Sequence, residues 1–170
     1  MEVKILFAEN QKFKQWWLWL ILLALNGVFI FGMVNQLYYN KPFGDKPTND
    51  SGLITGFVIV LLLTILFYFF KLQTLIKTDG IYVRFFPIYI AYKKYSWDTL
   101  IKSYVRKYSP IGEYGGWGIR FGFYRSGNAL NISGNYGLQL EILNKTKLLI
   151  GTNKPEELKE VLIKLDKYQE

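Results

Sequence analysis

The stretch WWLWLILLALNGVFIFGMV, residues 16–34, is nineteen residues long and carries no charged side chain. At about 1.5 Å of rise per residue, a helix of this length reaches about 28 Å, close to the ~30 Å thickness of a bilayer's hydrocarbon core. Asn26 is the only strongly polar residue in it. The stretch therefore predicts a first membrane-spanning helix at residues 16–34, preceded by a short cytoplasmic segment at residues 1–15.

A second apolar stretch, LITGFVIVLLLTILFYFF at residues 53–70, is also uncharged. Buried core helices, or a cleaved signal peptide for the first stretch, are the alternative interpretations. A domain of this size can hardly surround two helices that are apolar on every face, and no small-residue cleavage pattern follows the first stretch. The two stretches together predict a transmembrane helical hairpin, with residues 35–52 as a short external loop.

The distribution of Lys and Arg around these stretches predicts their orientation. Three lysines precede the first stretch, five Lys or Arg follow the second as far as residue 94, and the connecting loop holds two. Basic residues are enriched on the cytoplasmic side of membrane proteins. We therefore expect a multi-pass protein of the cell membrane with both termini in the cytoplasm.

Residues 71–170 are one hundred residues, enough for one small core. They hold sixteen Lys or Arg against nine Asp or Glu, so +7 of the chain's net charge of +8 lies here. The whole chain has no Cys and no His, which removes thiolate nucleophiles, Cys-bearing zinc sites and the commonest general base. We expect no catalytic residue, no metal site and no cofactor, and hence a protein that is not an enzyme.

Short segments rich in aromatic and β-branched residues alternate with turn signals throughout residues 71–152. They predict about seven antiparallel strands in a sandwich or open barrel. The segments are LQTLIK, IYVRFF, IYIAYKK, IKSYVRKY, WGIRFGFY, ALNIS, LQLEIL and KLLIGT. Apolar residues then recur at helical spacing from Leu158 to Leu165, which predicts one amphipathic C-terminal helix with Asn153 as its N-cap.

Three local motifs accompany this order of elements: the Asp79-Gly80 turn before IYVRFFP, the corner Ser96-Trp97-Asp98, and GTNKPEELKEVL at the last helix. With them, residues 71–168 resemble the bacterial pleckstrin-homology-like (PH-like) domains that follow paired membrane segments. The resemblance implies a two-sheet, mainly-β domain with one C-terminal helix. It implies no particular ligand, since such folds bind lipids, peptides or proteins.

A glycine-rich stretch, SPIGEYGGWGIRFG at residues 109–122, combines five glycines with Trp, Tyr, Glu and Arg. It matches neither of the phosphate-binding glycine patterns, and Glu113 has no second carboxylate in the stretch for hydrolytic chemistry. Its aromatic and basic neighbours are also typical of nucleic-acid stacking surfaces. Membrane anchoring argues against that function, so we expect no nucleic-acid partner.

Two interpretations of this stretch remain. In the first, the stretch has a structural role alone. Residues 112, 115 and 116 form a loop with positive φ, and residues 117, 119, 121 and 123 form the inward face of a strand. In the second, Arg120 stands between two glycines in a shallow groove and offers a planar fork to a carboxylate or phosphate. Glu113 could instead be the partner of Arg120, and Arg106 competes for that carboxylate.

The sequence predicts a binding surface in this region. Its candidate residues are Arg106, Lys107, Tyr108, Glu113, Tyr114, Trp117, Arg120 and Arg125. The leading hypothesis is a non-catalytic membrane adaptor that binds an acidic segment of a partner protein or a second copy of itself, because interfaces favour aromatic and Arg anchors. The alternative is binding of anionic lipid headgroups at the inner leaflet, and an enzyme is a distant third.

Overall fold

A computed structural model describes residues 4–122, 127–143 and 146–169 of the chain. It divides into two compact units, one formed by Lys14–Phe69 and the other by Met1–Phe13 together with Phe70–Glu170. The first unit is a helical hairpin and the second is a β domain. The hairpin is therefore inserted into the sequence of the β domain, after its first strand, an arrangement that the sequence analysis did not foresee.

The hairpin consists of α1 (Trp16–Met33), which continues into the π-helical turn η1 (Val34–Tyr38), and α2 (Asp50–Phe69). Both helices, taken as Trp16–Tyr38 and Asp50–Phe69, are long and apolar enough to cross a membrane. Most of their Leu, Ile, Val and Phe side chains are exposed, so these are not the core helices of a water-soluble fold.

Within the hairpin, α1 and α2 pack through small and polar residues. A Cβ added at Gly56 would lie 2.6 Å from Cε1 of Phe29, so a larger residue here would force this ring to move. Asn26 Nδ2 donates to the carbonyl oxygen of Leu22 at 2.7 Å and to Oγ1 of Thr64 at 2.8 Å. Such polar contacts and close approaches are what hold helices together in lipid.

Four antiparallel strands form the first sheet of the β domain, in the order β1 (Ile5–Lys12), β2 (Lys71–Lys77), β3 (Gly80–Phe86) and β4 (Lys93–Ser96). The alternation of LQTLIK places Leu72, Thr74 and Ile76 on the buried face. The predicted strand IYIAYKK is wrong over most of its length, since only its two lysines enter β4. Residues 87–92 form a loop instead.

Five strands form the second sheet, in the order β5, β8, β9, β7 and β6. Their bounds are β5 (Leu100–Lys107), β6 (Gly118–Phe121), β7 (Asn128–Asn131), β8 (Tyr136–Ile142) and β9 (Lys147–Thr152). The described residues thus hold nine strands rather than about seven. The predicted antiparallel arrangement is also incomplete, because β9 pairs antiparallel with β8 but parallel with β7.

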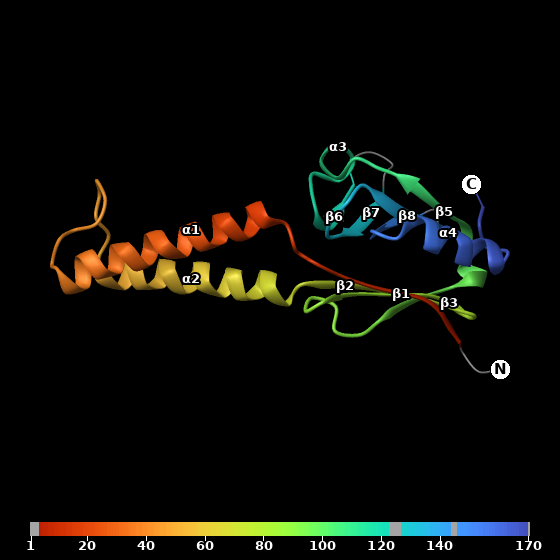
Figure 1. The fold of residues 1–170 in the computed structure, drawn as a ribbon, viewed down its shortest axis with the longest axis horizontal. Helices are drawn as coiled ribbons and strands as arrows, with labels where there is room; N and C mark the ends of the chain where they lie inside the picture. Colours follow the sequence, from red (N-terminus) through yellow and green to blue (C-terminus); the bar gives the residue numbers. More distant parts are fainter. Residues whose placement is uncertain (1–3, 123–126, 144–145, 170) are drawn as a thin grey trace. The chain divides into compact units, whose positions relative to one another are not determined.

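Figure 1 shows the two sheets as two layers, with α4 (Pro155–Lys164) beside them. The helix packs against β1, β5 and β8 and buries Leu158 and Leu162, as the predicted amphipathic helix requires. Its N-cap is Lys154, not Asn153. The Asn153 amide instead exchanges hydrogen bonds with the hydroxyl of Ser133.

A buried carboxylate joins the two sheets where β1 meets the end of β9. Glu9 Oε2 accepts a hydrogen bond from Oγ1 of Thr152 at 2.6 Å, and Oε1 accepts one from the backbone N–H of Asn153 at 2.8 Å. Gln11 Nε2 donates to the carbonyl oxygen of Gly151 at 2.7 Å. The N-terminal strand is thus an integral part of the β domain.

Candidate functional site

The glycine-rich stretch forms a short, capped helix, α3 (Pro110–Tyr114). Ser109 Oγ accepts a hydrogen bond from the N–H of Gly112 at 3.1 Å, and Pro110 occupies the first helical position. Gly115 ends the helix with a left-handed φ of 68°. These are the usual N-cap, first-turn and C-terminal residues of a helix, so local folding accounts for most of the unusual composition.

Glu113 pairs with Arg106 rather than Arg120. Arg106 Nη2 lies 2.7 Å from Glu113 Oε2, and Oε1 of the same carboxylate accepts the backbone N–H of Ser109 at 2.8 Å. Arg106 Nε also donates to Gln139 at 3.0 Å. Burial raises the pKa of Glu113, but the hydrogen bonds from Arg106 and Ser109 outweigh it and hold the pKa below its ordinary value.

Tyr108 and Tyr114 belong to the core, which corrects their prediction as surface contacts. Their rings pack edge to face with centroids 5.9 Å apart, and both side chains are buried. Asn131 Nδ2 donates to the Tyr108 hydroxyl at 3.0 Å, while Asn131 Oδ1 accepts the N–H of Gly118 at 2.8 Å. Burial raises the pKa of Tyr108 to about 12, so the phenol stays protonated at neutral pH.

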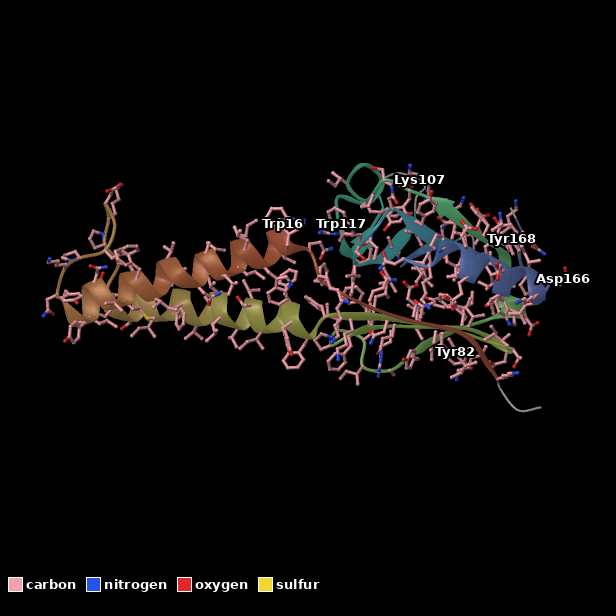
Figure 2. The ribbon with its side chains drawn as sticks, viewed as in Figure 1. Trp16, Tyr82, Lys107, Trp117, Asp166 and Tyr168 are labelled. Carbon is pink, nitrogen blue, oxygen red and sulfur yellow. The ribbon has the colours of Figure 1, made fainter. Side chains whose placement is uncertain are left out.

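Three further predicted residues that the structure describes are Lys107, Trp117 and Arg120. Lys107 is exposed at the end of β5, and Trp117 is half-buried just before β6 (Figure 2). Trp117 Nε1 donates to the carbonyl oxygen of Gly134 at 3.3 Å, and Arg120 Nε donates to the carbonyl oxygen of Trp117 at 2.9 Å. Arg125 lies outside the described residues.

The predicted inward face and positive φ angles are only partly correct. Phe121 is 78% exposed, so the strand does not bury all of its alternating apolar residues, and Phe123 lies outside the described residues. Gly115 and Gly116 have φ of 68° and 121°, as predicted. Gly112 instead lies within α3.

A groove of about 300 Å³ lies between the two sheets, and we call it the edge groove. One side is formed by β3, β4 and the loop of residues 87–92, and the other by β6, β7 and β9. Buried apolar side chains line its inner part, namely Val83, Ala129, Leu130 and Leu148. β4 and β6 are end strands of their sheets, whereas α4 packs on the opposite end strands, β1 and β5.

Two cations, Lys93 and Arg120, stand in the lining of the edge groove, and the described lining contains no carboxylate. Neither cation forms an ion pair with any carboxylate in the part of the chain that the structure describes. Tyr89, Tyr92 and Tyr95 also line the groove, and burial raises the pKa of Tyr95. The site therefore combines apolar walls with two positive charges that no described carboxylate neutralises.

Of the seven predicted binding residues that the structure describes, only Arg120 lines the edge groove. Sequence reasoning missed the groove because the alternation of IYIAYKK predicted a strand where the chain forms a loop. Pro87 was the available signal, since proline inside a strand-like run demotes it to an edge or a non-strand. The contribution of β6 and β7 could not be foreseen, because it depends on how the two sheets pack.

The described residues contain no group of three or more Cys, His, Asp or Glu placed to hold a metal ion. Comparison of the chain with protein-family models and with curated proteins gave no match. We therefore infer the function of this chain from its geometry.

Proposed function

We propose that this chain is a non-catalytic integral membrane protein whose β domain binds an anionic amphiphile of the membrane in the edge groove. The observation that carries this proposal is the groove itself, in which apolar walls enclose about 300 Å³ beside two cations that pair with no carboxylate among the described residues. We also infer that the β domain is PH-like. Its two sheets and C-terminal helix support this inference.

Membrane anchoring by α1 and α2 is the first part of the proposal. β1 precedes α1 and β2 follows α2, yet the two strands are hydrogen-bonded neighbours in one sheet. Two crossings return the chain to the side it left, so this pairing supports a hairpin with the whole β domain on one side. The excess of Lys and Arg outside the loop supports the cytoplasmic side.

The chemistry of the edge groove favours a ligand with one apolar and one acidic part. Pockets of a few hundred cubic ångströms with mostly apolar walls and a few polar groups are typical of small-molecule sites. Arg120 offers a fork of donors that suits a phosphate or carboxylate, and Lys93 adds a point charge. An anionic membrane lipid matches this combination, and the membrane supplies it locally.

A second candidate function is the adaptor that binds a partner protein. The observation that favours it is the exposed Phe121 in β6, an end strand whose single hydrogen-bonded neighbour among the described strands is β7. An unpaired strand edge can accept a strand from another chain. This candidate predicts a stoichiometric protein in purified material, whereas the first predicts a bound lipid.

The test is lipid binding by the full-length protein in mild detergent, followed by native mass spectrometry with added phosphatidylglycerol or phosphatidylcholine. Arg120→Gln combined with Lys93→Gln should weaken retention of phosphatidylglycerol severalfold. Ala91→Trp, at an exposed position in the groove lining, should block the groove and have the same effect.

Lys107→Gln combined with Lys102→Gln is the matched control, because it removes the same charge from β5, outside the groove lining. Equal loss of phosphatidylglycerol in this control would show that binding follows net charge alone, and would overturn the groove as the site. Unchanged retention in Ala91→Trp would do the same.

A further inference from the structure

The loop of residues 87–92 exposes large apolar side chains to solvent. Ile88 is 56% exposed and Ile90 is 73% exposed, with Tyr89 between them also exposed. Three consecutive exposed residues of this kind form a contiguous apolar patch, and exposed apolar patches are a feature of membrane and protein interaction sites.

The loop is held in this conformation by Arg84 of β3. Arg84 Nη1 donates to the carbonyl oxygen of Ile90 at 3.2 Å, and its guanidinium group lies 4.5 Å from the centre of the Tyr92 ring. The backbone N–H of Tyr89 donates to the carbonyl oxygen of Phe85 at 2.8 Å. The two isoleucines are therefore exposed although the loop that carries them is held by defined contacts.

The register of the first sheet shows which end of the sheet carries this loop. Lys71 at the start of β2 pairs with Lys12 of β1 and with Phe86 of β3. The chain leaves β1 for α1 just after Lys12, and it enters β2 from α2 just before Lys71. The loop begins at the residue after Phe86, so it leaves the sheet at the end where both connections to the hairpin are made.

This end of the sheet is joined to α2 by a very short connection. α2 ends at Phe69, two residues before Lys71, and each residue spans at most about 3.6 Å. Phe86 is on the neighbouring strand, about 5 Å from Lys71. Lys12 and Lys71 lie at the same end of the sheet, and such cations favour the surface of an anionic leaflet.

We propose that the loop of residues 87–92 inserts Ile88 and Ile90 into the interfacial region of the same bilayer that α1 and α2 span. The proposal rests on membrane anchoring, the first part of the proposed function, and does not require a ligand in the edge groove. The loop shares Tyr89 and Tyr92 with the groove lining. Insertion would therefore bring the groove to the lipid from which its ligand comes.

The absence of cysteine from the chain makes a site-specific depth measurement possible. The full-length protein, with Ile88→Cys or Ile90→Cys labelled by an environment-sensitive fluorophore, is reconstituted into vesicles of phosphatidylcholine and phosphatidylglycerol. Quenching by spin-labelled acyl chains is compared with quenching by aqueous iodide. The matched control is Ile163→Cys in α4, where the isoleucine is 55% exposed.

The proposal predicts severalfold stronger lipid quenching, and weaker iodide quenching, at positions 88 and 90 than at position 163. Iodide quenching at 88 and 90 equal to that at 163, without lipid quenching, would overturn it. A label at Leu62→Cys in α2 separates the two parts of the account. Lipid quenching there without quenching at 88 and 90 would refute only the loop, whereas its absence at Leu62 would refute the membrane anchoring itself.

Discussion

Two segments of the β domain exchange the roles that their sequences predict. The glycine-rich stretch around α3 has the composition of a binding site, yet its Tyr114 is 2% exposed and its Glu113 is paired with Arg106. The loop of residues 87–92 has the alternation of an ordinary strand, yet it exposes two isoleucines and lines the edge groove. The unusual composition of the glycine-rich stretch reflects the requirements of its local fold. The candidate site is instead lined by the loop of residues 87–92, whose ordinary apolar residues are exposed.

The largest effect is expected at Tyr114, because this residue of the glycine-rich stretch is part of the core. Tyr114→Ala should lower the free energy of unfolding by about 3–5 kcal/mol, because it removes a fully buried aromatic ring and leaves a cavity. Thermal unfolding of the full-length protein in mild detergent measures this. Tyr89→Ala, in the exposed loop, is the control and should change stability by less than about 0.5 kcal/mol. Similar small losses in both variants would place Tyr114 on the surface.

A smaller effect is expected from Glu113→Gln, which removes the ion pair with Arg106. The loss should be about 1 kcal/mol at pH 7, since both partners are only partly exposed and the bond is charge-assisted. The pKa of Glu113 is lower in the folded state than its ordinary value of 4.5. The ionised carboxylate therefore stabilises the folded state fully at pH values well above 4.5. This contribution to the free energy of unfolding is lost as the pH falls through the lowered pKa of the folded state.

The difference in melting temperature between wild type and Glu113→Gln should accordingly shrink as the pH is lowered from 7 to below 4. A difference that stays constant over this range would show that the carboxylate charge does not stabilise α3. Glu157→Gln, whose ion pair with Lys154 is more exposed, serves as the comparison and should have less effect at pH 7.

Arg84→Ala tests whether the loop of residues 87–92 is held in place. Losing the contacts to Ile90 and Tyr92 should speed amide hydrogen exchange in the loop, because local opening then costs less. The lost hydrogen bonds to Gln73 of β2 should lower the free energy of unfolding by about 1 kcal/mol. Arg84→Lys keeps the charge without the planar fork and should show most of the same increase. Unchanged exchange in both variants would mean that Arg84 does not order the loop.

The smallest effect on stability is expected for Ile90→Ser, since the side chain is already exposed. The free energy of unfolding should change by less than about 0.5 kcal/mol, so the melting temperature in detergent should not change measurably. Ile76→Ser, at a fully buried isoleucine of β2, should destabilise strongly and validates the assay. A large loss in Ile90→Ser would identify the loop as part of the core.

Local sequence patterns predicted the elements that depend on local physics. Uncharged stretches of bilayer length indicated the helices of the hairpin, and the spacing of Leu158 and Leu162 indicated the buried face of α4. Ile5–Lys12 was missed as a strand, because its pairing with β2 is made across the whole inserted hairpin. No local signal reports a partner that lies 59 to 72 residues away, from Lys12 with Lys71 to Ile5 with Lys77.

The candidate site was predicted poorly for a related reason. A carboxylate such as Glu113 has two arginines within reach in the sequence, and only the packing of β5 against α3 selects Arg106. The edge groove is made by the β3–β4 and β6–β7 edges, which meet only when the sheets face each other. Arg120 was identified because a large side chain between two glycines is a local signal.

Hydrogen–deuterium exchange of the full-length protein in lipid nanodiscs, with and without phosphatidylglycerol, observes both segments in one experiment. We predict that the anionic lipid slows exchange in residues 87–93 and 119–121, while residues 109–116 exchange at an unchanged rate. Slower exchange in residues 109–116 without any change in residues 87–93 would contradict it, and would return the binding site to the glycine-rich stretch.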